Sequence, residues 1–219
     1  MKEQSSNQLL NLNEGKAGMK QARPIILASS SPRRKELLAG LGLSFSIQPS
    51  HIIEEVDMSC PPEEIVQLLA QQKAEAVAKE VQDGVVLGAD TIVVIDGKVL
   101  GKPQTKEMAF DMLKQLQNHV HEVYSGVALF DVETKERYIG FQQTTVKMKA
   151  LQDEEIQQYI MTGEPMDKAG SYAIQGIGAT FVEEIRGDYF TVVGLPLLMT
   201  ANFLKKAGID ILQQGNKAK

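Results

Sequence analysis

The stretch that most limits the fold is VVLGADTIVVIDG, residues 85–97, in which apolar and mostly β-branched residues surround one internal carboxylate. Residues 85–87 and 91–95 have the composition of buried strands, and the Asp-Gly pair that follows is typical of a tight hairpin turn. Asp90 interrupts the apolar run at a mostly buried position, where a charge needs a cation, a hydrogen-bond donor or a metal beside it. Asp90 is therefore either a satisfied structural carboxylate that caps a turn or a functional acid.

The remaining sequence is a mixture of strand and helix patterns without internal repeats. Further strands are predicted at 25–28, 123–132 and 137–148. Helices are predicted from Pro32 to a stop near Gly42, and at 62–80, 105–117, 153–162 and 196–207. Residues 169–196 have the pattern of strands and tight turns. Because strands and helices do not alternate strictly, a mixed α/β architecture is favoured over a doubly wound parallel sheet.

Composition sets outer limits on the protein class. The 219 residues are 43% hydrophobic and 23% charged, which suits one globular domain or two small lobes. Residues 1–22 have the composition of a polar extension and lack a secretory signal, and no apolar run approaches the ~20 residues that span a bilayer. The single cysteine, Cys60, excludes a disulfide framework and favours a reducing cytoplasm. A net charge of −5 and only one short basic tract argue against nucleic acid as a partner.

A second constraint is the sequence ILASSSPRRKELL, a strand followed at once by a helix. Ser31 has the features of an N-cap, and Arg33 and Arg34 fall in the first turn, where the helix dipole is already positive. Backbone N–H groups, two guanidiniums and the hydroxyls of Ser29 and Ser31 together favour a phosphate site. The alternative is that both arginines are solvated or pair with an acidic neighbour such as Glu36.

Two further motifs carry candidate polar groups. Lys102 follows the 96–97 turn, from where its ammonium can return toward Asp90, although an isolated lysine is more often simply exposed. The segment EPMDKAGSYAIQG contains Asp167, Lys168 and Gln175 among glycines, and the Gln175 amide offers both a donor and an acceptor. The alternative for this segment is a glycine-rich turn with an exposed ion pair.

Together, LASSSPRRKELL, LGADTIVVIDGKVLGKP and EPMDKAGSYAIQGIGATFVEEIRGDYFTVVGLPL resemble the Maf family of nucleoside triphosphate pyrophosphatases. The resemblance covers about residues 24–207. It implies a mixed α/β fold with two lobes around a central cleft, similar to the inosine triphosphate pyrophosphatases. The implied reaction is hydrolysis of a nucleoside triphosphate to the monophosphate and pyrophosphate, with a divalent metal, Mg²⁺ or Mn²⁺. We place the family domain at 23–212 and a polar tail at 213–219.

The resemblance also implies roles for individual residues. Arg33 and its turn would hold the triphosphate, and Asp90 would act as proton acceptor. Lys102 and Lys73 would neutralise phosphate oxygens. An acidic residue that the family carries after its second strand matches Glu54, with Glu55 as the alternative, because this sequence is one residue longer than the usual pattern there. Glu54 and Asp90 would hold the metal.

The motif DKAGSYAIQG, with Thr91 after Asp90, resembles the branch of the family that acts on dTTP and UTP. The Gln175 carboxamide matches the O4 and N3–H edge of thymine or uracil, so Arg33, Thr91 and Gln175 are the expected specificity residues. Two alternatives stay open at this stage: the family branch that acts on 7-methyl-GTP, and a nucleotide-responsive regulator of cell division that acts by binding. The sequence also leaves open whether the protein forms a homodimer.

Overall fold

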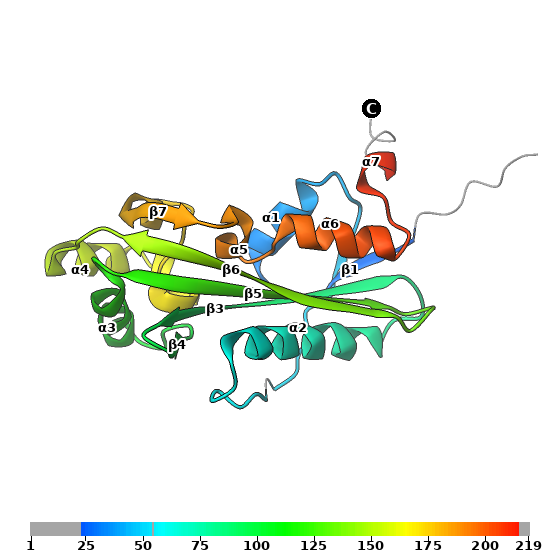
Figure 1. Ribbon diagram of the computed structural model, residues 1–219, viewed down its shortest axis with the longest axis horizontal. Coiled ribbons are helices and arrows are strands. Elements are labelled where there is room, and N and C mark those ends of the chain that lie inside the picture. Colours follow the sequence, from blue (N-terminus) through cyan, green and yellow to red (C-terminus); the bar gives the residue numbers. More distant parts are fainter. Residues whose placement is uncertain (1–22, 54, 215–219) are drawn as a thin grey trace, which may run out of the picture.

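The computed structural model describes residues 23–53 and 55–214, and one mixed sheet runs through them (Figure 1). The strand order is β2-β1-β3-β5-β6-β7, and β4 pairs with β3. β1 is parallel to β2 and β3, whereas the pairs formed by β3, β4, β5, β6 and β7 are antiparallel. The strands are β1 (Ile25–Leu27), β2 (Ser46–Ile47), β3 (Val85–Ile95), β4 (Lys98–Leu100), β5 (Val120–Asp131), β6 (Arg137–Met148) and β7 (Val182–Arg186). The predicted mixed α/β class is confirmed.

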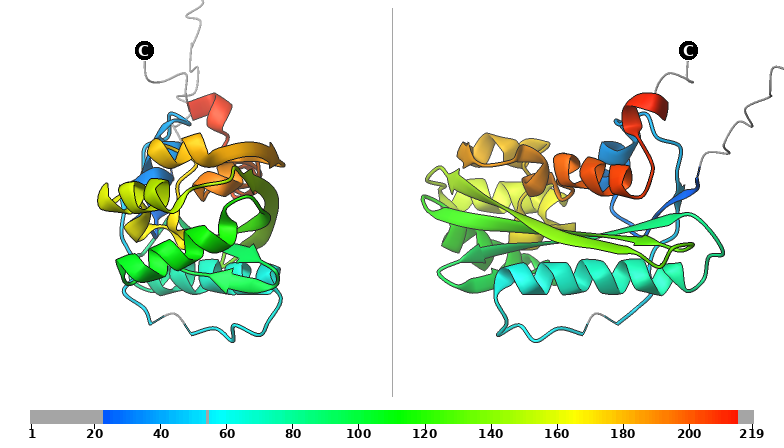
Figure 2. Two further views of the ribbon diagram at one scale, coloured as in Figure 1. Left: turned by 90° about the vertical axis from the view of Figure 1, so that its left-hand side faces the viewer. Right: turned by 45° about the vertical axis from the view of Figure 1, so that its right-hand side comes forward.

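Helices cover both faces of this sheet. The α-helices are α1 (Pro32–Ala39), α2 (Pro62–Ala78), α3 (Lys106–Leu116), α4 (Asp153–Met161), α5 (Tyr189–Val193), α6 (Leu197–Lys206) and α7 (Ile211–Gln214). Three 3₁₀ turns are η1 (Glu164–Asp167), η2 (Ala169–Ser171) and η3 (Ile177–Phe181). α2 runs along one face of the long strands, and α1, α5 and α6 lie over the other face (Figures 1 and 2). The sheet is therefore the middle of three layers.

Two glycines allow α2 to rest directly on the sheet. A Cβ built on Gly88 of β3 would lie 2.3 Å from Ala70 O, and one built on Gly126 of β5 would lie 2.2 Å from Val66 O. Such distances are too short for any side chain. The backbone of α2 therefore contacts the backbone of the two central strands.

Two hydrophobic clusters occupy the opposite face, toward the two ends of the long strands. One packs Val93 and Ile95 of β3 against α3 and α4, and the other packs Val85 and Leu87 against α1 and α6. Between them β3 carries Thr91, which opens into the cleft described below. This arrangement confirms the predicted two lobes around a central cleft.

The two strand segments predicted at 85–87 and 91–95 are parts of a single strand, and Asp90 lies at a buried position within it, as predicted. β3 is one continuous strand, Val85–Ile95, in which Asp90 is in register with Gly126 of β5. A carboxylate can stay within a buried strand when another element supplies a cation, and the local sequence does not show that cation. The predicted hairpin is confirmed, since Asp96 and Gly97 both have positive φ and β4 returns antiparallel to β3.

The segment predicted as strands and turns, 169–196, is only partly so. It contains one strand, β7, together with η2, η3 and the short helix α5. Closely spaced glycines favour tight turns, and here these turns take the 3₁₀ form. The sequence pattern also did not predict α7, which crosses the domain boundary placed at 212.

The predicted polar extension, 1–22, lies outside the described residues, as does 215–219 of the predicted tail. In the part of the chain that the structure describes, no helix combines the length and hydropathy needed to cross a bilayer.

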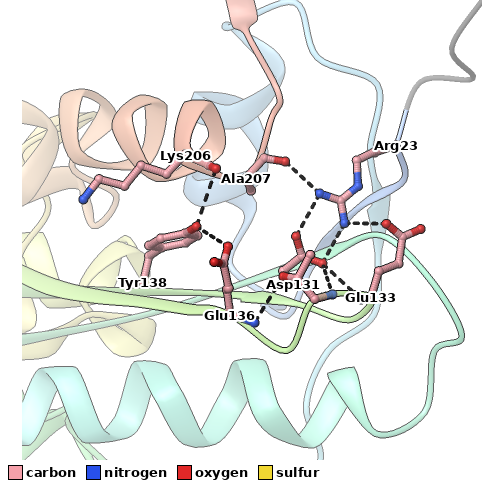
Figure 3. Close-up of polar contacts among 8 residues, drawn as sticks. Arg23, Asp131, Glu133, Glu136, Tyr138, Lys206 and Ala207 are labelled. Carbon is pink, nitrogen blue, oxygen red and sulfur yellow. Dashed lines mark hydrogen bonds and ion pairs between the residues drawn. The ribbon is translucent and has the colours of Figure 1, made fainter.

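An ion-pair cluster closes the end of the sheet near the first described residue (Figure 3). Arg23 donates to both carboxylate oxygens of Asp131, at 2.7 and 2.9 Å, and to Ala207 O at 2.7 Å. The backbone N–H groups of Glu133 and Thr134 also donate to Asp131. The hydrogen bonds from Arg23 lower the pKa of Asp131 to about 2. The cluster joins the start of β1, the β5–β6 turn and the end of α6.

Candidate active site

The turn between β1 and α1 places hydroxyl groups at the N-terminus of α1. Ser31 occupies the N-cap position and Pro32 the first helical position, as predicted. The Ser31 side chain makes no capping hydrogen bond, and the Ser31 backbone N–H donates instead to Ser29 Oγ at 3.2 Å. A helix N-terminus leaves its first N–H groups without intrahelical partners, and the first turn of α1 has no acidic residue. This turn is therefore suited to binding an anion.

The two arginines of α1 are placed differently. Arg34 donates from Nε to Gly194 O at 2.8 Å, and from its terminal nitrogens to Thr91 Oγ1 at 3.0 Å and Ser29 Oγ at 3.3 Å. These bonds hold the β1–α1 turn against β3 and the end of α5. Arg33 is half-buried and makes no hydrogen bond or ion pair within 23–53 and 55–214, so the pairing with Glu36 considered above is not formed there. Arg33 is therefore the arginine available to a ligand.

A chain of hydrogen bonds fixes the direction of the Thr91 hydroxyl. Ser125 Oγ donates to Thr191 O at 2.8 Å, so the contact of 2.8 Å between Ser125 and Thr91 takes its proton from Thr91. Thr91 Oγ1 in turn accepts from Arg34. Thr91 lines the cleft, but its proton is used inside the protein, and its predicted role in specificity stays a prediction.

Asp90 points to the other face of β3, toward α2, because successive side chains of a strand alternate between faces. Lys73 Nζ of α2 lies 2.5 Å from Asp90 Oδ1, and each of the two side chains is 12% exposed. The positive charge of Lys73 offsets the buried negative charge of Asp90. Close contact of α2 with Gly88 brings Lys73 to this position.

These groups meet in a cleft of about 590 Å³ at an open edge of β3. β1 pairs with β3 at residues 85–87 and β4 pairs at 93–95, so between them β3 has a strand neighbour, β5, on one edge only. Side chains from both faces of β3 therefore reach the cleft. The predicted site residues that line it are Ser29, Ser31, Arg33, Arg34, Lys73, Asp90, Thr91, Lys102, Asp167 and Lys168.

Further charged groups lie at the rim. Lys102 is exposed, as expected for an isolated lysine, but it also lines the cleft. Asp167 and Lys168 form the ion pair that their adjacent positions in the sequence allowed. Partial burial raises the pKa of Asp167, but the hydrogen bond from Lys168 and the charges of Lys168 and Arg33 outweigh it and lower the pKa. Arg33 and Lys168 thus place positive charge on the same side of the cleft.

The structure does not bring every predicted residue to the cleft. Gln175 is half-buried and is not among the lining residues, although its neighbour Ile174 is. Glu54 lies outside the described residues. The alternative, Glu55, is exposed and does not line the cleft, and its backbone oxygen accepts a hydrogen bond from Gln72. The roles of Glu54 and Gln175 stay predictions.

The donor groups of the cleft limit how it could hold a metal. Within residues 23–53 and 55–214, no group of three His, Cys, Asp or Glu side chains is arranged to bind an ion. Asp90 supplies one buried carboxylate. Mg²⁺ is commonly held by one or two carboxylates together with substrate phosphates. The residues present fit an ion shared with a phosphate ligand and do not fit a cage made by these residues alone.

Comparison with models of known protein families shows the family to which the chain belongs. The model described as Maf-like protein matches residues 24–207. The chain belongs to the Maf family. The extent of the match agrees with that of the resemblance carried by the motifs.

Similar proteins of this family come from several bacteria, and three of them, each named dTTP/UTP pyrophosphatase, cover most of the chain. The relative from Desulforamulus reducens is 48% identical over 190 residues, covering 87% of this chain and 100% of the relative. Those from Bacillus pumilus and Thermoanaerobacter sp. (strain X514) are 51% and 52% identical over 185 residues, covering 84% and 83% of this chain and 97% and 95% of the relatives. Among solved structures, the Staphylococcus aureus Ham1 protein aligns with a TM-score of 0.44 at 15% identity, covering 73% of this chain and 80% of that chain.

A buried polar pair behind the cleft of this Maf protein was not predicted from the sequence. Tyr172 lines the cleft, and its hydroxyl lies 2.7 Å from Nε2 of His121 on β5. Burial lowers the pKa of His121 to about 4, so the imidazole is neutral at pH 7. No local pattern connects a histidine in one strand with a tyrosine 51 residues later. Their pairing depends on the packing of η2 onto the sheet.

Proposed function

We propose that this protein hydrolyses dTTP and UTP to the monophosphate and pyrophosphate, by attack of water on the α-phosphorus. The observation that carries the proposal is the buried Lys73–Asp90 pair inside a cleft that also presents Arg33, Lys102 and Lys168. Its support from comparison is that relatives 48–52% identical to this chain are named dTTP/UTP pyrophosphatase.

The triphosphate binds where positive charge gathers without a large basic surface. The N-terminus of α1 offers backbone N–H groups, and Arg33 lies in its first turn and lines the cleft. Lys102 and Lys168 approach from the rim. Guanidinium groups form strong, charge-assisted hydrogen bonds to phosphate oxygens. These groups hold the leaving pyrophosphate and stabilise the charge that develops on it.

Asp90 is the proposed proton acceptor for the attacking water. Its carboxylate is buried at the wall of the cleft, and Lys73 holds one of its oxygens. Position matters as much as basicity, since a general base must lie within hydrogen-bond reach of the proton that it takes. A divalent metal, Mg²⁺ or Mn²⁺, when bound, supplies charge neutralisation at phosphate and lowers the pKa of a bound water. We propose that Asp90, with Glu54 as a second ligand, holds this ion together with the phosphates.

Base selection is the finest part of the proposal. Gln175 is assigned to the O4 and N3–H edge of thymine or uracil, and Arg33 and Thr91 to the adjoining end of the nucleotide. The acidic net charge of −5 supports a free nucleotide, and not a nucleic acid, as substrate. We place the reaction in the cytoplasm, which the single cysteine favours.

The test is a product assay over dTTP, UTP, CTP, dGTP and 7-methyl-GTP, with pyrophosphate and orthophosphate measured separately. The proposal expects pyrophosphate as product and the largest kcat/KM for dTTP and UTP. Gln175→Ala is expected to reduce that preference by at least about tenfold and to retain hydrolysis, because a site built to hydrogen-bond its substrate loses discrimination when those atoms are removed.

Other outcomes of this assay separate the alternatives. A maximum for 7-methyl-GTP would contradict the assigned branch and the role of Gln175, but not pyrophosphate release. Tight nucleotide binding without turnover would favour the regulator that acts by binding. Release of orthophosphate alone would contradict attack at the α-phosphorus.

A further inference from the structure

We propose that Glu164, together with Tyr159, is a positioning residue that fixes the turn at 173–178 and thereby sets the selectivity of the cleft for the nucleotide base. This inference rests on the proposed function, because it names what controls substrate choice at the same site. Glu164 does not line the cleft, so its effect passes through the backbone that it holds.

The Glu164 carboxylate is the centre of three hydrogen bonds. Its Oε1 accepts from Gly178 N at 2.9 Å and from the Tyr159 hydroxyl at 2.9 Å, and its Oε2 accepts from Ile177 N at 3.0 Å. Burial raises the pKa of Glu164, but these bonds outweigh it and lower the pKa, so the carboxylate is the form present at neutral pH. Consecutive backbone N–H groups that converge on one anion form a compact and rigid turn.

The turn is shaped to receive this carboxylate. Gly176 has φ 73° and ψ −147°, a conformation that is largely restricted to glycine. A Cβ built on Gly176 would lie 2.6 Å from Glu164 Oε2. The glycine is therefore required both by its backbone angles and by the close approach of Glu164.

The hydroxyl of Tyr159 binds the other end of the same turn. Besides donating to Glu164, its hydroxyl accepts from Ala173 N at 3.3 Å, and its ring packs edge to face on Phe181. The amides of Ala173, Ile177 and Gly178 are thus held by two side chains. The residues between these contacts include Ile174, which is buried, and Gln175, which is half-buried, and they belong to a turn whose two ends are fixed.

The position of this turn connects it to substrate choice. Ala173 and Ile174 line the cleft directly, beside Tyr172. Gln175 follows immediately, so its reach toward a ligand depends on the backbone that Glu164 holds. Of the groups proposed to hold the triphosphate, those at α1 and Lys102 lie on other elements. Lys168 contacts Glu164 only through the Glu164 backbone oxygen, which a change of the side chain leaves in place. A change at Glu164 is therefore expected to affect recognition of the base and to leave phosphate binding unchanged.

Glu164→Gln is the sharpest test, since it keeps the size of the side chain and removes one acceptor. A carboxamide has one acceptor oxygen, whereas the two Glu164 oxygens accept three donors here. In either orientation the new NH₂ group faces a backbone N–H or the tyrosine hydroxyl. The expected result is a rise of about ten- to hundredfold in KM for dTTP, with the preference for dTTP over dGTP reduced by a similar factor.

Inorganic tripolyphosphate separates a defect in base recognition from collapse of the site. As a competitive inhibitor without base or sugar, it should keep its inhibition constant within about twofold in Glu164→Gln, because its contacts are those of the phosphates. Glu154→Gln is the matched control, since Glu154 is an exposed glutamate on α4 and its change removes the same charge. The control should retain both the KM for dTTP and the preference.

Tyr159→Phe provides a second, milder variant that keeps the ring packed on Phe181. It removes a donor to Glu164 and the acceptor of Ala173 N, and should shift the dTTP preference in the same direction by a smaller factor. Unchanged preference in both variants, or an equal rise in KM for dTTP and in the inhibition constant of tripolyphosphate, would overturn the inference. A wild-type protein that hydrolyses no nucleoside triphosphate would instead contradict the proposed function.

Discussion

Two buried carboxylates of this protein, Asp90 and Asp131, are each paired with a cation, but they differ in how completely they are bound. Asp131 receives two hydrogen bonds from Arg23 and two from backbone N–H groups at the β5–β6 turn. Among the described residues, Asp90 receives one from Lys73 at one oxygen, and Asp90 lines the cleft. A carboxylate whose oxygens are all hydrogen-bonded stabilises the segments that it joins. A carboxylate in a cleft with one oxygen available can accept a proton from water or bind a ligand.

The largest effect is expected for Asp90→Asn. The change keeps the shape of the side chain and removes its basic oxygen, so kcat for dTTP should fall by at least ~100-fold. The variant should stay folded at the assay temperature because the amide oxygen can still accept from Lys73, but its melting temperature should fall, since the Lys73 ammonium loses its anionic partner. Turnover and thermal unfolding of the same preparation test both parts, and near-normal turnover would move the base to another group, with Glu54 as the first choice.

Two arginines permit a second contrast, because Arg33 lines the cleft whereas Arg23 is paired with Asp131. Arg33→Ala should weaken dTTP binding by about ten- to hundredfold, since charge-assisted hydrogen bonds to phosphate contribute ~1.5–3 kcal/mol. Its effect on the unfolding free energy should be small, because Arg33 has no hydrogen-bond partner in the described residues. Calorimetric titration with a non-hydrolysable dTTP analogue is the measurement. If wild type and variant bind the dTTP analogue with equal affinity at moderate salt, Arg33 does not contact the triphosphate.

The smallest effect on turnover is expected for Asp131→Asn, which should act on stability. Removing one partner of a buried ion pair costs several kcal/mol, and we expect about 2–3 kcal/mol here because the Arg23 side chain is 24% exposed. Urea unfolding measures the loss. Turnover per folded molecule should be unchanged, so a large loss of kcat at temperatures where the variant is folded would contradict the division between the two carboxylates.

The pH dependence of stability gives an independent check on the same residue. The folded-state pKa of Asp131 is about 2, below the ordinary ~3.9 of an aspartate. A depressed pKa contributes stability above the ordinary value, and this contribution is lost as the pH falls toward 2. The difference in unfolding free energy between wild type and Asp131→Asn should therefore narrow below about pH 4. A difference that stays constant down to pH 2 would show that the carboxylate charge is not its source.

The sequence predicted the parts of the site that follow from local rules. Ser31 and Pro32 indicate a helix start, and the need to compensate a buried Asp90 indicates a cation, a hydrogen-bond donor or a metal nearby, of which the structure shows a cation. The identity of that cation follows from packing, because Lys73 reaches Asp90 only when α2 rests on Gly88. The difference between Arg33 and Arg34 is equally non-local, since it depends on Gly194, which follows α5.

The segment around Glu164 shows a further limit of sequence patterns. Its glycines predict turns, but their spacing does not show which side chain binds the freed amides. Glu164 lies 13 residues before Ile177 and is brought to it by η1 and η3. The resemblance to a family indicates candidate residues within about 24–207, whereas the hydrogen bonds from the turn at 173–178 to Glu164 and Tyr159 depend on tertiary packing.

The contact of α2 with Gly88 and Gly126 has a consequence for how the protein loses activity. Side chains can adjust to one another when heat or solvent expands a core, but two backbones in direct contact have no such adjustable layer between them. The separation of Lys73 and Asp90 should therefore stay constant until α2 detaches from the sheet. Inactivation on heating should accordingly coincide with cooperative unfolding, without an earlier phase in which the protein is folded and inactive.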